Sequence, residues 1–133
     1  MRGPLVAALV LALVSVTMPA RAWDTTVTFQ VPVKLQNLDP QVGKIFMQCT
    51  ITDGQNWSLS GVSSQMPVPN GSYIGTLPVA VPVPSADLGK AKQWHCIVRL
   101  QQVGGGVTTA INNPGHPWTK AAPGSVGDVA GQF

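Results

Sequence analysis

The chain has 133 residues, of which 44% are hydrophobic and only 10% are charged, and its formal net charge is +3 at pH 7. The length suits a single domain. The low charge and the lack of a cluster of basic residues argue against nucleic acid as a partner.

Residues 1–22 have the pattern of a secretory signal peptide. Arg2 provides a positive charge, Leu5–Val16 form an apolar run, and Ala20-Arg21-Ala22 places small residues where a signal peptidase cleaves. The run is too short to span a membrane, and no later stretch is long enough. We therefore expect an exported protein, periplasmic or secreted, that begins at Trp23; the alternative is an uncleaved anchor. Removal of both leader arginines leaves six cationic and five acidic side chains, a net charge of +1.

Residues 25–36 alternate between apolar and polar side chains. The apolar ones occupy the odd positions: Val27, Phe29, Val31, Val33 and Leu35. A period of two predicts a strand with one buried face. This strand either completes the protein's own core or is offered to a neighbouring molecule. We expect it to pair within its own chain, because a small domain needs all five apolar side chains in its core.

The same alternation continues through residues 44–52, and Asp53-Gly54 then predicts a two-residue hairpin turn. The return strand is expected at residues 56–62, with Trp57 and Leu59 on its apolar face.

The second half of the chain predicts further strands separated by glycine and asparagine turns. Asn70-Gly71 precedes a strand that ends near Val83, and residues 94–103 form the next, with Trp94, Cys96, Val98 and Leu100 facing inward. A short strand is expected at residues 107–111 after the glycines at 104–106. Residues 112–133 are rich in Gly and Pro and predict a loop and a flexible, mobile C-terminal tail. The β-sandwich domain is therefore expected at residues 23–111.

Three prolines, Pro78, Pro82 and Pro84, lie in the same phase of one predicted strand. Backbone N–H groups two residues apart point to the same edge of a strand, so these prolines remove donors from one edge only. This placement predicts an edge strand. A polyproline-type linker is the alternative interpretation.

Cys49 and Cys96 lie on inward positions of different predicted strands. In an exported chain an even pair of cysteines predicts a disulfide, with two buried thiols as the alternative. The fold class expected is all-β: a single antiparallel β-sandwich in which this disulfide joins the two sheets through the core.

The Cys pair resembles that of the immunoglobulin-like sandwiches. Trp94 stands two residues before the second Cys, where that family usually has Tyr, and Trp57 lies closer to the first Cys than the family's core Trp does. The string Asp-x-Gly-x-Tyr-x-Cys does not occur. The resemblance therefore implies an immunoglobulin-like architecture and not membership of the family.

The chain also resembles the bacterial pilin subunits that chaperones assemble. The shared features are the signal peptide, the Cys pair, a β-sandwich and an alternating N-terminal strand that acts as a donor strand. The C-terminal sequence VGDVAGQF departs from that family, because it has neither an alternating apolar strand nor a penultimate Tyr.

Groups that carry catalysis are sparse. His95 lies on the outward face of a predicted strand and His116 in a predicted loop, no Ser lies in a G-x-S-x-G motif, and the chain has no Glu. The His and Asp residues show no metal-ligand spacing. We therefore expect no enzyme activity, no cofactor and no metal.

The sequence GHPW combines a histidine and an aromatic residue on a predicted loop. His116, Pro117 and Trp118 are therefore a candidate binding loop. The alternative is that Trp118 folds back over the end of the core.

We expect a monomer that works by binding or by structural assembly, in the cell envelope or outside the cell. Its partner would be a protein or another envelope component. A pilus-like subunit that uses residues 25–36 as a donor strand is one alternative, and a small secreted enzyme or enzyme inhibitor is another.

Overall fold

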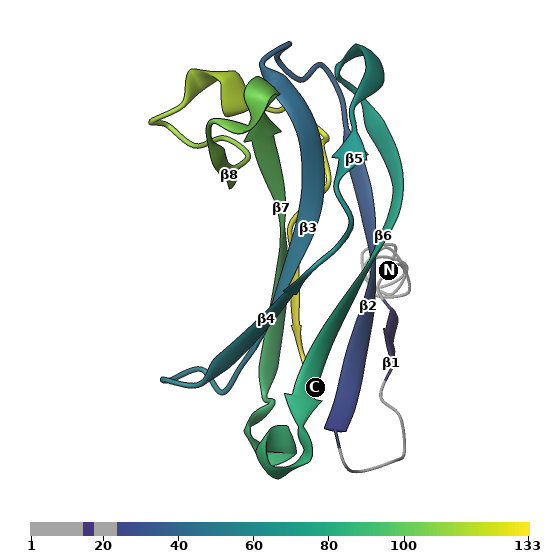
Figure 1. Ribbon diagram of the computed structural model, residues 1–133, viewed down its shortest axis with the longest axis vertical. Helices are drawn as coiled ribbons and strands as arrows, with labels where there is room; N and C mark the ends of the chain where they lie inside the picture. Colours follow the sequence, from purple (N-terminus) through teal and green to yellow (C-terminus); the bar gives the residue numbers. More distant parts are fainter. Residues whose placement is uncertain (1–14, 18–23) are drawn as a thin grey trace, which may run out of the picture.

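A computed structural model describes residues 15–17 and 24–133, and these residues form mainly β-strands (Figure 1). In chain order the strands are β1 (Ser15–Thr17), β2 (Asp24–Leu35), β3 (Val42–Thr52), β4 (Ser58–Val62), β5 (Met66–Pro67), β6 (Tyr73–Pro84), β7 (Gln93–Gln102), β8 (Thr108–Ala110) and β9 (Val129–Gln132). Short 3-10 helices lie between them: η1 (Pro69–Gly71), η2 (Ser85–Lys90), η3 (Val103–Gly105) and η4 (Pro117–Thr119). Among the described residues no helix is both long and apolar enough to cross a membrane.

The strands form two antiparallel sheets that lie as two layers (Figure 1). In one sheet the order is β1-β2-β6. In the other it is β4-β3-β7-β8, with β5 also paired to β3 and β9 to β7. We call them the β2–β6 sheet and the β3–β7 sheet. This confirms the expectation of a mainly β protein with antiparallel pairing.

The core lies between the two sheets and is built from the alternating apolar positions. All five odd-numbered apolar side chains of β2 are at most 2% exposed. The ring of Phe29 on β2 lies 5.2 Å from that of Trp94 on β7, so the two sheets meet there. β2 pairs with β6 of the same chain along its whole length, from Asp24 opposite Pro84 to Leu35 opposite Tyr73. The first alternating strand therefore belongs to this protein's own core.

The hairpin between β3 and β4 has a longer loop than Asp53-Gly54 predicts. Thr52 pairs with Ser58, so five residues form the loop. The Asp53 carboxylate accepts hydrogen bonds from the backbone N–H groups of Gln55 (2.8 Å) and Trp57 (3.1 Å), and Gly54 adopts a φ of 83°. The aspartate thus folds a wider loop around its own side chain.

The proline positions confirm an edge strand. Pro78, Pro82 and Pro84 all lie in β6, which ends the β2–β6 sheet. Their partners across the ladder are even-numbered residues of β2. In an antiparallel ladder, residue pairs that bond to each other alternate with pairs whose N–H and C=O groups point away from the partner strand. Proline fits the second kind of position, so the N–H groups that these prolines lack would have faced away from β2.

Cys49 and Cys96 are bonded to each other, but the expectation of a bridge between the sheets is wrong. Cys49 on β3 lies directly opposite Cys96 on β7 in the same sheet, with Cα atoms 4.0 Å apart. Two inward-facing residues can be neighbours in one sheet or face each other across the core, and alternation alone does not distinguish the two cases. The immunoglobulin pattern therefore does not extend to this disulfide.

Residues 112–133 differ from the expected loop and tail because part of this segment adds to the β3–β7 sheet. β9 pairs with β7, from Gln132 opposite Gln93 to Val129 opposite Cys96. Gly131 allows this pairing, because a Cβ at that position would lie 2.6 Å from the indole of Trp94.

Three residues of the expected signal peptide form β1, which pairs with β2. The rest of that segment, including the expected cleavage point before Trp23, lies outside the described residues.

Candidate functional site

The candidate binding loop occupies residues 112–120, at one end of the molecule (Figure 1). The chain leaves β8 at Ala110 and turns at Asn112, whose φ is 56°, and the loop contains η4. Asn and Gly tolerate this left-handed conformation better than other residues do, so the turn is encoded locally. We refer to this segment as the 112–120 loop.

Thr119 holds the loop together from inside. Its side chain is fully buried, and its hydroxyl donates to the backbone carbonyl of His116 at 2.7 Å. The same oxygen accepts a hydrogen bond from the backbone N–H of Asn113 at 2.8 Å. The backbone of Thr119 also pairs with that of Asn112 and His116. One buried hydroxyl thus bridges both halves of the loop.

The two asparagines fix the loop to the sheet. The Asn113 amide donates to the Thr109 hydroxyl on β8 at 2.6 Å, and its oxygen accepts from the backbone of Gly115 at 2.9 Å. The Asn112 side chain accepts from the backbone of Ala121 at 3.0 Å. These bonds constrain the loop on both sides, which is typical of a binding loop held by a rigid scaffold.

The loop surrounds an open cleft of about 280 Å³. Its lining residues are Asn112, Asn113, Pro114, His116, Pro117, Thr119 and Lys120. His116 is half-buried and its ring lies 5.8 Å from that of Trp118. Trp118 is only 8% exposed and packs with the core, so it supports the loop from below.

The structure therefore brings His116 and Pro117 to the cleft and places Trp118 beneath it. The two asparagines, Thr119 and Lys120 are lining residues that sequence reasoning missed. The pair Asn112-Asn113 before Pro114 is the signal that could have indicated a structured turn.

Two side chains that line the cleft can bind a ligand directly. His116 provides an imidazole and Lys120 an exposed cation, and no acidic residue is among the lining residues. The Thr119 hydroxyl donates its proton to the backbone carbonyl of His116. Such a cleft suits an anionic or hydrogen-bonding group of a ligand.

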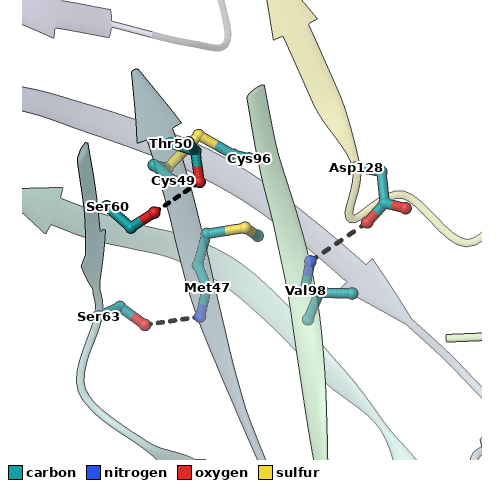
Figure 2. Close-up of a disulfide and its surroundings, with 8 residues drawn as sticks. All are labelled: Met47, Cys49, Thr50, Ser60, Ser63, Cys96, Val98 and Asp128. Carbon is teal, nitrogen blue, oxygen red and sulfur yellow. Dashed lines mark hydrogen bonds between the residues drawn. A yellow bond between two sulfur atoms is a disulfide. The ribbon is translucent and has the colours of Figure 1, made fainter. Parts of the chain in front are cut away.

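The other residue pair identified from the sequence, Cys49 and Cys96, lies inside the β3–β7 sheet (Figure 2). Both cysteines are fully buried. On one side of them the hydroxyls of Thr50 and Ser60 lie 2.8 Å apart, joining β3 to β4. The disulfide is therefore a structural link and not an accessible redox site.

The remaining polar contacts in Figure 2 hold the neighbouring strands. Ser63 accepts from the backbone N–H of Met47 at 2.9 Å, and Asp128 accepts from that of Val98 at 3.2 Å. His95 is exposed on β7 and is not a lining residue of the 112–120 cleft. In the part of the chain that the structure describes, no cluster of three or more His, Cys, Asp or Glu residues could hold a metal.

Comparison of the chain with protein-family models, with curated proteins and with solved structures finds no match.

Proposed function

We propose that the mature chain is an exported binding module, periplasmic or secreted, without chemistry of its own. In architecture we assign it to the β-sandwiches, since its two antiparallel sheets share one core. The disulfide supports export, because such bonds persist in oxidising compartments. The ligand is a protein or another envelope component.

The observation that carries this proposal is the internal bonding of the 112–120 loop. The Thr119 hydroxyl and both asparagine side chains are used to hold the loop. Within the described residues no hydrogen bond or ion pair involves the side chains of His116 or Lys120, and both line the cleft. A rigid loop that presents a cation and an imidazole is prepared for an anionic group such as a carboxylate, since little order is lost on binding.

A donor-strand subunit is less well supported. Residues 25–36 supply five buried side chains to their own core, and transfer of this strand to a neighbour would remove them.

Quantitative capture from envelope extract tests the proposal. The processed protein serves as bait beside the variants His116→Ala and Lys120→Ala, with His95→Ala and Lys92→Ala as matched controls on exposed positions outside the cleft. Partners that bind the 112–120 loop should be lost with the first pair and kept with the second. Capture that is equal for all four variants would contradict the proposal.

A further inference from the structure

The outer edge of β2 is covered by a segment that export would remove. β1 pairs there in an antiparallel register, with Val16 opposite Phe29 and Thr17 opposite Thr28 (Figure 1). β1 lies within the expected signal peptide. The inference that follows rests on the export in our proposed function, because cleavage leaves this edge of β2 without its partner.

The free backbone groups of that edge belong to the even-numbered residues of β2. Lys34 exchanges two hydrogen bonds of 2.8 Å with Val126, on the side of β2 away from β6. Orientation alternates along a strand, so the N–H and C=O groups of Thr26, Thr28 and Gln30 point to the same side as those of Lys34. Pro32 offers only its carbonyl there.

The two edges of the β2–β6 sheet are protected very differently. On β6 the outer edge carries three prolines, which cannot donate to another strand. On β2 the stretch from Asp24 to Gln30 has no proline. Natural proteins protect exposed sheet edges, so an edge left open after processing calls for an occupant.

The segment seated on this edge indicates what that occupant is. β1 reads Ser15-Val16-Thr17, and β2 itself contains the equivalent Thr26-Val27-Thr28. Suppose that Thr26-Val27-Thr28 of a second copy replaces Ser15-Val16-Thr17 on this edge. Its Val27 then lies opposite Phe29, and its Thr28 lies opposite Thr28 of the first copy. That register is two-fold symmetric, as a dimer of identical chains requires. We propose that the mature chain forms a dimer by antiparallel pairing of β2 with β2, centred on Thr28.

The extent of this pairing fits the ends of the open edge. Asp24 of the second copy lies opposite Pro32, and the next outward position, Lys34, is already bonded to Val126. The ladder stops there with about eight backbone hydrogen bonds, since Pro32 has no N–H to donate.

No like charges oppose each other along the ladder, because its outward residues Thr26, Thr28 and Gln30 are uncharged.

The assembly is closed. Each copy uses the outer edge of β2, and the prolines of β6 protect the two ends of the combined sheet. A monomer is the expectation from the sequence alone; the vacated edge leads to a discrete dimer instead.

Cysteine cross-linking of the processed protein tests both the pairing and its register. Intact mass first establishes that the exported chain begins at Trp23. In Thr28→Cys the two introduced cysteines face each other with a Cα spacing of about 5.5 Å, which suits a disulfide. Mild oxidation should therefore convert most of this variant to a covalent dimer. Thr26→Cys, which faces Gln30 of the second copy, and Thr76→Cys on β6 should stay monomeric in denaturing gels.

Sedimentation of proline variants provides the independent readout. Thr28→Pro removes the central donor from the open edge and should convert the dimer to a folded monomer. The matched change Thr76→Pro, on the outer face of β6, should leave the dimer intact. A wild-type monomer at about 100 μM, a retained leader, or cross-linking of all three Cys variants alike would overturn the dimer. Equal partner capture by the cleft variants and the control variants, with an intact dimer, would instead count against the 112–120 loop, so the two proposals fail separately.

Discussion

Gly61 on β4 lies directly against the backbone carbonyl of Ala80 on β6, so closely that a Cβ at position 61 would overlap that oxygen. β4 belongs to the β3–β7 sheet and β6 to the β2–β6 sheet. The two sheets therefore approach each other backbone to backbone at this point, and only glycine fits there.

Replacement of Gly61 by alanine should destabilise the fold by about 1–3 kcal/mol, because a backbone segment must move to admit the methyl group. Gly89→Ala is the control, since a Cβ at Gly89 would meet no atom within 4 Å. Urea denaturation of both variants measures the difference. Equal stabilities would show that the sheets do not approach as described.

Loss of the Cys49–Cys96 bond should lower the free energy of unfolding by about 2–5 kcal/mol, the usual effect of removing a native disulfide from a small domain. The double variant Cys49→Ala, Cys96→Ala measures this by denaturation without leaving a free thiol. Alkylation of the native exported protein followed by mass analysis is the companion measurement. Two alkylated cysteines would refute the bond.

Phe29→Ala should cost about 3–5 kcal/mol, since the ring is fully buried and contacts Trp94 across the core. Thr76→Ala, at an exposed position on β6 of the same sheet, should change stability by less than about 0.5 kcal/mol. Thermal unfolding followed by near-ultraviolet circular dichroism compares them. A folded Phe29→Ala protein of unchanged stability would argue that β2 does not carry the core.

Asp53 should make the hairpin sensitive to acid. Hydrogen bonds from the backbone N–H groups of Gln55 and Trp57 lower the pKa of its carboxyl from the ordinary value of 3.8. Because the folded-state pKa is the lower one, the stabilisation is present above about pH 4 and is lost as the pH falls through the folded-state pKa. Asp53→Asn should therefore be less stable than wild type at pH 6, and the difference should shrink as the pH falls through the folded-state pKa. A gap in melting temperature that is constant over this range would contradict the role of the charge.

The elements that sequence alone predicts best are those in which local pattern and burial agree. The odd positions of β2 and the inward face from Trp94 to Leu100 follow directly from a period of two. A period of two does not show which strand pairs with which. For this reason Cys49 and Cys96 are expected on opposite sheets from the sequence, whereas they lie in the same sheet. Strand β9 was missed because Gly131 and its neighbours have no alternation, and only the indole of Trp94 explains why a glycine is required there.

The candidate site likewise contains residues that the sequence predicts and residues that it does not. His116 and Pro117 were found because their residue types are conspicuous, whereas Thr119 was missed because a buried hydroxyl has no sequence signal of its own. Its role depends on contacts with Asn113 and His116 that exist only once the loop has folded.

Residue-resolved hydrogen exchange of the processed protein tests most directly whether β2 belongs to its own chain. The alternation of the ladder bonds the N–H groups of Val27, Phe29, Val31 and Val33 to β6. These amides should exchange only through global unfolding, at every protein concentration. Those of Thr26, Thr28 and Gln30 should become protected only as the dimer forms. Fast exchange at Phe29 and its odd-numbered neighbours in the folded protein would contradict the account.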